Sequence, residues 1–251
     1  MFPKKNYFFS VVFLILTLTS CNKNDDFNGG SYSYKSKIGN SANDILSNAI
    51  FTDLYIEVMY VEGFSPSSEA LKNLETFIKA RTYKSLVIIE SRLISIEKKD
   101  IYTIDDVRTI EDANRLLFTQ NNQLVVSALF LNGKSSSDKD SMVILGTAHR
   151  NTSFVIFEES IKKSTNFFFE RAELILETSV ILHEFCHLLG LVNIGSPMIS
   201  DHQDDENGYH CNNPKCLMYY QEESFYNRLN KYEIPKLDAN CLADLRANGG
   251  K

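Results

Sequence analysis

The segment His183-Glu-Phe-Cys-His187-Leu-Leu-Gly190 contains two histidines four residues apart and a glutamate directly after the first. On a helix, residues four apart face the same side, so both imidazoles can reach one metal ion. Zinc accepts imidazole nitrogen at about 2.0–2.1 Å, and a catalytic zinc site needs three protein ligands and an open position for water. Glu184 then lies where its carboxylate can act as general base toward that water. The spacing therefore predicts a hydrolytic centre with one catalytic Zn²⁺ as cofactor.

The competing interpretation is that these are surface histidines on an amphipathic helix. Leu182, Leu188 and Leu189 instead predict a buried helix. Unpaired imidazoles and a carboxylate are costly in such surroundings, so a shared metal ion is the better explanation.

A third metal ligand is not obvious from the spacing. Gly190 can adopt the left-handed conformation that ends a helix and turns the chain. The pattern His-Glu-x-x-His-x-x-Gly, with a methionine further on, resembles the metzincin zinc peptidases. That family has His or Asp three residues after the glycine, where this sequence has Asn193. An amide is a poor zinc ligand, so the third donor must come from elsewhere.

The run His210-Cys-Asn-Asn-Pro-Lys-Cys216-Leu-Met218 resembles the archaemetzincins, in which the third His is followed by Cys, four residues, Cys, one residue and Met. The resemblance implies that His210 is the third zinc ligand and that Met218 is the Met-turn residue beneath the ion. His202 is the alternative third ligand. Some metzincins use the Tyr two residues after the Met to stabilise the oxyanion, which implies that role for Tyr220; the alternative is that its ring only fills the floor of the cleft.

Four cysteines follow residue 22: Cys186, Cys211, Cys216 and Cys241. In an oxidising compartment they permit two disulfides, with three possible pairings. Archaemetzincins use the two cysteines of the run above with a Cys-x-x-Cys pair to hold a second, structural zinc, and this sequence has no Cys-x-x-Cys. Because of that departure we expect Cys211–Cys216 and Cys186–Cys241 disulfides. The alternative is a two-Cys metal site completed by His202 or Asp204.

The N-terminus has the pattern of an export signal. Lys4 and Lys5 precede an apolar run over residues 7–18, which is too short to span a bilayer. The run ends in Leu-Thr-Ser-Cys21, which resembles a bacterial lipobox; the alternative is a plain signal peptide with an incidental cysteine. We expect a lipoprotein signal peptide over residues 1–20, lipidation of Cys21, a flexible tether over 21–42 and a metallopeptidase domain over 43–251.

Runs of β-branched and aromatic residues predict strands over 54–61, 86–96, 124–131, 142–145 and 153–157. Residues 146–150 fit a turn or bulge. Helical spacing predicts helices that open near 65–66, span 111–118 and 168–189, and run from about 235 to 246. With the resemblance, this predicts an α/β (α+β) metzincin-like fold: a mixed, mostly parallel twisted sheet, an active-site helix and a loop-rich C-terminal half ending in a helix. The resemblance also implies that residues 142–147 form the sheet edge above the cleft.

The chain carries 26 Lys and Arg against 32 Asp and Glu, for a net charge of −6, with no dense basic block. Nucleic acid is therefore excluded as a partner. The function we expect is a monomeric zinc-dependent endopeptidase in the bacterial cell envelope, with a polypeptide substrate and only a lipid anchor in the membrane. The alternatives are a metal-dependent amidase and a non-catalytic zinc-containing surface-binding lipoprotein, although Glu184 is a residue that a structural zinc does not need.

Overall fold

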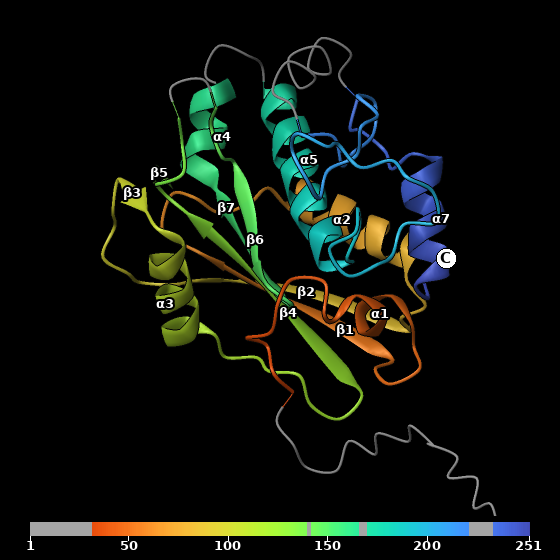
Figure 1. Cartoon of the computed structure of the whole chain (residues 1–251). Coiled ribbons are helices and arrows are strands. Elements are labelled where there is room, and N and C mark those ends of the chain that lie inside the picture. The colour runs from red at the N-terminus through yellow and green to blue at the C-terminus, as the bar shows by residue number, and fades with distance from the viewer. Residues whose placement is uncertain (1–31, 140–141, 166–169, 221–232) are drawn as a thin grey trace, which may run out of the picture. The chain divides into compact units, whose positions relative to one another are not determined.

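The computed structural model describes residues 32–139, 142–165, 170–220 and 233–251 (Figure 1). The expected signal peptide and the lipidation site at Cys21 lie outside the described residues. None of the helices in the described ranges is long and apolar enough to cross a membrane.

The central feature is a five-stranded sheet with the order β2-β1-β4-β7-β6. Strands β2, β1, β4 and β7 are parallel to one another, and β6 runs antiparallel to β7 at the edge of the sheet. Their bounds are β1 Asp53–Tyr60, β2 Leu86–Leu93, β4 Gln123–Leu131, β6 Gly146–Arg150 and β7 Ser153–Phe157. Two short strands, β3 (Ile101–Tyr102) and β5 (Lys134–Ser135), form a second, parallel pair. The predicted mixed, mostly parallel sheet is confirmed.

Helices cover both faces of this sheet. The described helices are α1 Ala42–Leu46, α2 Ser68–Arg81, α3 Ile104–Asn114, α4 Glu158–Thr165, α5 Glu170–Leu188 and α7 Ala239–Ala247. In Figure 1, α2 and α5 lie on one side of the sheet, and α3 lies on the other with β3 and β5. Helix α5, which carries the His-Glu-x-x-His pattern, packs against both α2 and the edge strand β6.

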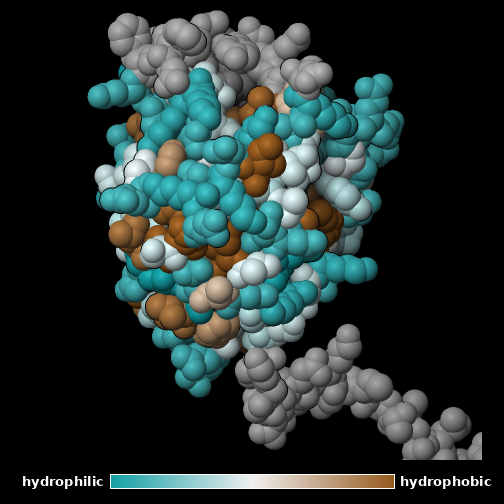
Figure 2. All heavy atoms as spheres, turned by 90° about the vertical axis from the view of Figure 1, so that its left-hand side faces the viewer, coloured by the Kyte–Doolittle hydropathy of each residue, from teal (hydrophilic) through white to brown (hydrophobic). Residues whose placement is uncertain are grey.

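The two faces arise from the alternation of side chains along each strand. On β1, Ile56 and Val58 enter the core beneath α2 and α5, whereas Met59 enters the smaller core beneath α3. Because most strands are buried on both faces, they are apolar almost throughout, as parallel strands are when helices cover them. Figure 2 shows the face that points left in Figure 1, where hydrophilic surface separates several apolar patches.

The edge strand differs from the expectation. Residues 142–145, predicted as a strand, precede it, and the predicted turn at Gly146–Arg150 is itself β6. This segment pairs with β7 and contains a bulge between Ala148 and Arg150. The bulge was expected, but the strand was missed because its sequence lacks the run of β-branched residues that strands favour.

Helix boundaries differ too. Helix α3 begins at Ile104 instead of 111, because Thr103 and Asp106 form a capping box. Helix α7 begins at Ala239 instead of 235, with the Asp238 side chain as its N-cap. The helices α1 and α4 and the β3–β5 pair were not predicted.

The described part of the expected tether contacts the domain. The Tyr32 hydroxyl donates a hydrogen bond of 2.8 Å to Asp44 Oδ2, and the Ser36 amide donates one of 3.0 Å to Asn151 Oδ1. In the described part of the chain, residues 32–42 thus make specific hydrogen bonds with the domain.

Two carboxylates meet where α4 packs on α5. Glu177 accepts hydrogen bonds from the amide and the hydroxyl of Ser67, at the start of α2. Glu158 is only 1% exposed, and its Oε2 has no hydrogen-bond partner among the described residues. Burial, with repulsion from Glu177, raises the pKa of Glu158 to about 9.

Because this pKa is raised, the protonated carboxyl stabilises the fold fully below pH 4.5, its ordinary pKa, and the contribution is lost as pH rises through about 9. Glu158→Gln, which stays neutral, is expected to stabilise the protein at pH 8 by on the order of 1 kcal/mol, or about 2–4 °C in Tm, with little change at pH 4.5. Thermal unfolding at the two pH values measures this.

The matched control is Glu159→Gln. The Glu159 carboxylate accepts hydrogen bonds from the Lys163 side chain and the Gly133 amide, and both lower its pKa. The control variant should therefore lose a little stability at pH 8, the opposite sign. Equal effects of the two substitutions at pH 8 would contradict the assignment.

Candidate metal centre and active site

Three imidazoles converge at the C-terminal end of α5. His183 and His187 lie one turn apart on this helix, and His210 approaches from the loop that follows. The centroid of the His210 ring lies 5.2 Å from that of the His183 ring and 5.1 Å from that of the His187 ring. One ligand atom from each of the three residues lies within 4.8 Å of the others.

The donor atoms fit a metal ion. In two of the rings, a backbone carbonyl lies within hydrogen-bond distance of Nδ1. His183 Nδ1 lies 2.9 Å from Leu217 O, and His210 Nδ1 lies 2.7 Å from Asn207 O. Donation by Nδ1 leaves Nε2 unprotonated, the arrangement that second-shell partners impose on metal-binding histidines. The Nε2 atoms of His183 and His187 are 3.1 Å apart, close to the roughly 3.3 Å between two nitrogens bound to one tetrahedral zinc ion.

The centre also favours neutral imidazole, the form that binds metal. Burial and the neighbouring rings of His183 and His210 hold the pKa of His187 well below its ordinary value. Its Nδ1 is buried without a hydrogen-bond partner among the described residues. A cation between the three rings would offset the cost of gathering these polar groups away from water.

Glu184 lies between α5 and the edge strand. Its Oε2 accepts a hydrogen bond of 2.7 Å from the amide of Ala148 on β6. Burial raises the pKa of Glu184 to about 8, and this hydrogen bond opposes the increase. A Cβ at Gly146 would lie 2.7 Å from Glu184 Cγ and 2.9 Å from Val180 Cγ1, so the glycine is what lets β6 approach the carboxylate.

The two candidate third ligands lie in different places. His210 joins the imidazole cluster, whereas His202 is buried with its Nε2 2.8 Å from Asp244 Oδ2. Gly190 ends α5 with φ +73°, as predicted, and Asn193 is exposed with φ +64°.

Met218 and Tyr220 follow His210 along the chain. Met218 is fully buried, and its carbonyl accepts a hydrogen bond of 2.8 Å from the Cys211 amide. The Tyr220 ring lies 5.0 Å from that of His210, and its hydroxyl donates to the sulfur of Met142. Tyr220 therefore borders the imidazole cluster.

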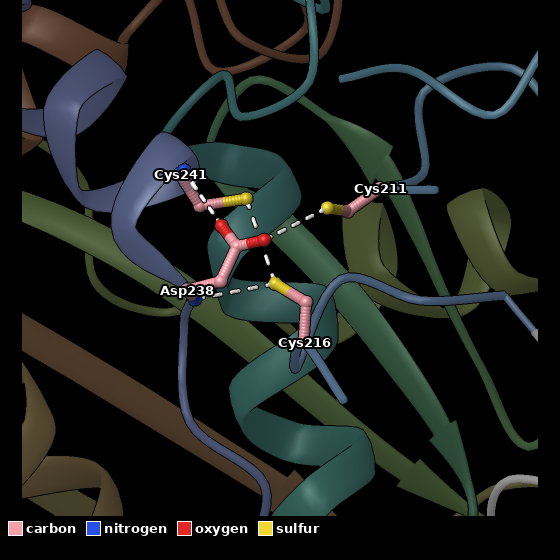
Figure 3. A group of neighbouring side chains, drawn as sticks. All are labelled: Cys211, Cys216, Asp238 and Cys241. Atoms are coloured by element: carbon pink, nitrogen blue, oxygen red, sulfur yellow. Dashed lines mark hydrogen bonds between the residues drawn. The ribbon is translucent and has the colours of Figure 1, made fainter. Parts of the chain in front are cut away.

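A second cluster lies beside the first, made of Cys211, Cys216, Asp238 and Cys241 (Figure 3). One ligand atom from each lies within 4.8 Å of the others, and the sulfurs of Cys216 and Cys241 are 3.6 Å apart. Hydrogen bonding with the Cys211 and Cys241 side chains lowers the pKa of Cys216. The amides of Met218 and Asp238 also point at its sulfur, at 3.5 and 3.4 Å. Three sulfurs and a carboxylate are a four-ligand set suited to a closed, structural zinc site.

This cluster corrects the expected disulfides. All four described cysteines are free thiols, and Cys186 packs in the main hydrophobic core instead of pairing with Cys241. His202 and Asp204 do not belong to the cluster. Asp238 was not predicted as a ligand, although Asp238-Ala-Asn-Cys241 has the spacing of Cys-x-x-Cys with an aspartate in the first position.

Comparison with known proteins agrees on the fold. The structure is similar to archaemetzincin from Methanopyrus kandleri, with a TM-score of 0.51, 14% identity, and coverage of 78% of this chain and 96% of that one. It also matches a zinc-dependent peptidase from Methanocorpusculum labreanum (TM-score 0.48, 13% identity, coverage 76% and 99%) and archaemetzincin from Archaeoglobus fulgidus (0.42, 14%, 76% and 99%). No family model and no curated protein matches the sequence. The first of these shows a shared fold at low identity.

The cysteine cluster gives a prediction about metal content. Removing one of four ligands weakens a structural zinc site strongly, so Cys216→Ser is expected to lower bound zinc by about one equivalent and to lower Tm. Metal analysis and thermal unfolding of the purified protein measure both. Cys186→Ala is the control, a buried cysteine outside the cluster, and should keep its zinc. Unchanged zinc content in Cys216→Ser would show that this cluster holds no metal.

Proposed function

We propose that this chain is a zinc-dependent endopeptidase of archaemetzincin type, with His183, His187 and His210 as the zinc ligands. The observation that carries the proposal is the convergence of three imidazole nitrogens beside a buried carboxylate, Glu184. Two additional observations support it: the fold is shared with an archaemetzincin, and a sheet edge runs past the carboxylate.

The chemistry is divided between metal and protein. A bound zinc ion supplies Lewis-acid activation of the scissile carbonyl and makes water acidic enough to attack near neutral pH. Glu184 takes the proton from the attacking water and delivers it to the leaving amine. The Ala148 amide holds the Glu184 carboxylate in place during both transfers.

Strand β6 supports a polypeptide substrate over a small amide. It lies at the edge of the sheet, and its partner among the described strands is β7, on one side. An extended peptide can add to such an edge through main-chain hydrogen bonds. The contact between Ala148 and Glu184 places that edge directly beside the proposed general base.

Tyr220 is the proposed oxyanion donor. Its ring borders His210, and its hydroxyl donates to the Met142 sulfur, a weak acceptor. Substrate oxygen that develops negative charge would be a stronger acceptor for the same hydroxyl.

Two further parts of the proposal rest on the chain outside this centre. Cys211, Cys216, Asp238 and Cys241 would hold a structural zinc. The lipobox-like segment ending at Cys21 supports export to the bacterial cell envelope and attachment through a lipid.

The general-base role gives a direct test. Glu184→Gln removes the proton acceptor but preserves the size of the side chain, so turnover of a quenched peptide library is expected to fall by at least about 10³-fold. Zinc content should stay at the wild-type value, because Glu184 is not among the proposed ligands.

Glu177→Gln is the matched control: it lies on the same helix and is also buried, and its cleavage rate should stay near that of the wild type. Tyr220→Phe is expected to keep zinc and to lower kcat by about tenfold or more, with a smaller effect on KM. Undiminished cleavage by Glu184→Gln would refute the mechanism. Zinc binding by the wild type without cleavage of any peptide would favour the amidase or the binding protein.

A further inference from the structure

A cavity of about 720 Å³ lies at the end of β6. Four regions far apart in the sequence line it: the N-terminal segment 35–40, helix α3, the end of β6 at His149 and Arg150, and the loops that follow α5. Asn193, Ile194 and Tyr209 come from those loops, and Arg108 comes from α3.

The lining of this cavity is basic. It contains four cationic side chains and no carboxylate; the cations are Lys35, Lys37, Arg108 and Arg150. Asp112 lies close behind the lining and pairs with Lys35 at 2.9 Å and with Arg150 at 2.6 Å. The charges of Lys35 and Arg150 are therefore largely compensated.

The other two cations are available. Among the described residues, Arg108 makes one long, exposed ion pair of 3.4 Å with Asp105 and donates to the carbonyl of His149. Lys37 forms no ion pair within the described part of the chain and lies exposed at the cavity. These two side chains therefore leave the cavity with a net positive charge.

His149 forms part of the wall of the cavity. It is the extra residue of the β6 bulge, and a bulge redirects the side chain that it carries. The ring is buried, yet neither of its nitrogens has a hydrogen-bond partner among the described residues. Burial, with the nearby charges of Arg150 and Arg108, lowers the pKa of His149 to about 3, so the ring is neutral and keeps one N–H donor. Its Nδ1 lies 3.9 Å from Oε2 of the buried Glu111, so the ring belongs to the wall of the cavity and leaves recognition of a ligand to the cations.

Two segments of the chain connect the cavity directly to the proposed catalytic centre. Tyr209 lines the cavity and directly precedes His210. On β6, His149 and Arg150 directly follow Ala148, whose amide contacts Glu184. Since a strand advances about 3.3 Å per residue, a peptide paired with β6 would bring a side chain to the cavity within about two residues of the bond facing Glu184.

We infer that this cavity is a subsite for a carboxylate of the polypeptide substrate, held by Lys37 and Arg108. The inference rests on the proposed peptidase function and adds to it a preference for substrates with an acidic group near the cleaved bond. The carboxylate belongs to an internal Glu or Asp, or to the C-terminus of the substrate; both present the same group to the cavity.

The test measures binding separately from cleavage. The protein is zinc-loaded Glu184→Gln, and fluorescent decapeptides with amidated C-termini carry one Glu or one Gln at successive positions. We expect Glu at one favoured position to bind about tenfold tighter than Gln, which is roughly one charge-assisted hydrogen bond. Adding Lys37→Gln and Arg108→Gln should abolish this preference. Lys72→Gln, which removes an exposed charge from α2 outside the cavity, should leave it intact.

A second arm separates the two sources of the carboxylate. Peptides with Gln throughout and a free C-terminus should gain the same tenfold over their amides if the terminal carboxylate is the ligand. Equal affinities in both arms would overturn the inference, as would a preference that survives loss of Lys37 and Arg108.

The outcome also distinguishes this inference from the proposed function. Cleavage by the wild type with no preference for an acidic group would remove the subsite and leave the peptidase. Selective carboxylate binding without any cleavage by the wild type would remove the peptidase and leave a carboxylate-binding site.

Discussion

Three unprotonated imidazole nitrogens repel one another unless a cation lies between them, and the fold brings them together in a partly buried place. The spacing on α5 sets two of the rings, with Nε2 atoms 3.1 Å apart. The Leu217 carbonyl orients His183, and the Asn207 carbonyl orients His210. Packing of α5 against the sheet and against α2 supplies the rigid support that this close approach needs.

Residues of the cysteine cluster directly adjoin, in the sequence, residues of the imidazole centre. Cys211 directly follows His210, and Leu217, which orients His183, directly follows Cys216. A metal ion held by Cys211, Cys216, Asp238 and Cys241 would therefore fix both ends of the loop that completes the imidazole site. It would also protect thiols 3.6 Å apart from oxidation in an oxidising compartment. The loop would otherwise depend on a few hydrogen bonds for its position.

Local patterns in the sequence predicted the features that are local in space. The four-residue spacing of His183 and His187 needs only one helix, and Gly190 needs only its own left-handed conformation. The parallel strands were recognisable because burial on both faces makes them apolar. The residues of the capping box at Thr103 can also be recognised in the sequence, but the start of α3 was predicted seven residues too late.

Features that depend on tertiary contacts were not predicted. Strand β6 is a strand because β7 offers it an edge, and its own residues have little preference for extended structure. Asp238 reaches the cysteines because it caps α7, a role that any N-cap aspartate could have without a metal nearby. The cavity near His149 is assembled from residues more than 170 positions apart, and no pattern along the chain marks it.

The most direct measurement of the central claim is an anomalous difference map, collected at the zinc absorption edge from crystals of the metal-loaded protein. The proposed zinc site predicts a peak about 2.0–2.1 Å from Nε2 of His183, His187 and His210, with Glu184 beside the peak and not bound to it. A map with no peak among the three imidazoles, or with zinc bound only by the cysteine cluster, would contradict it.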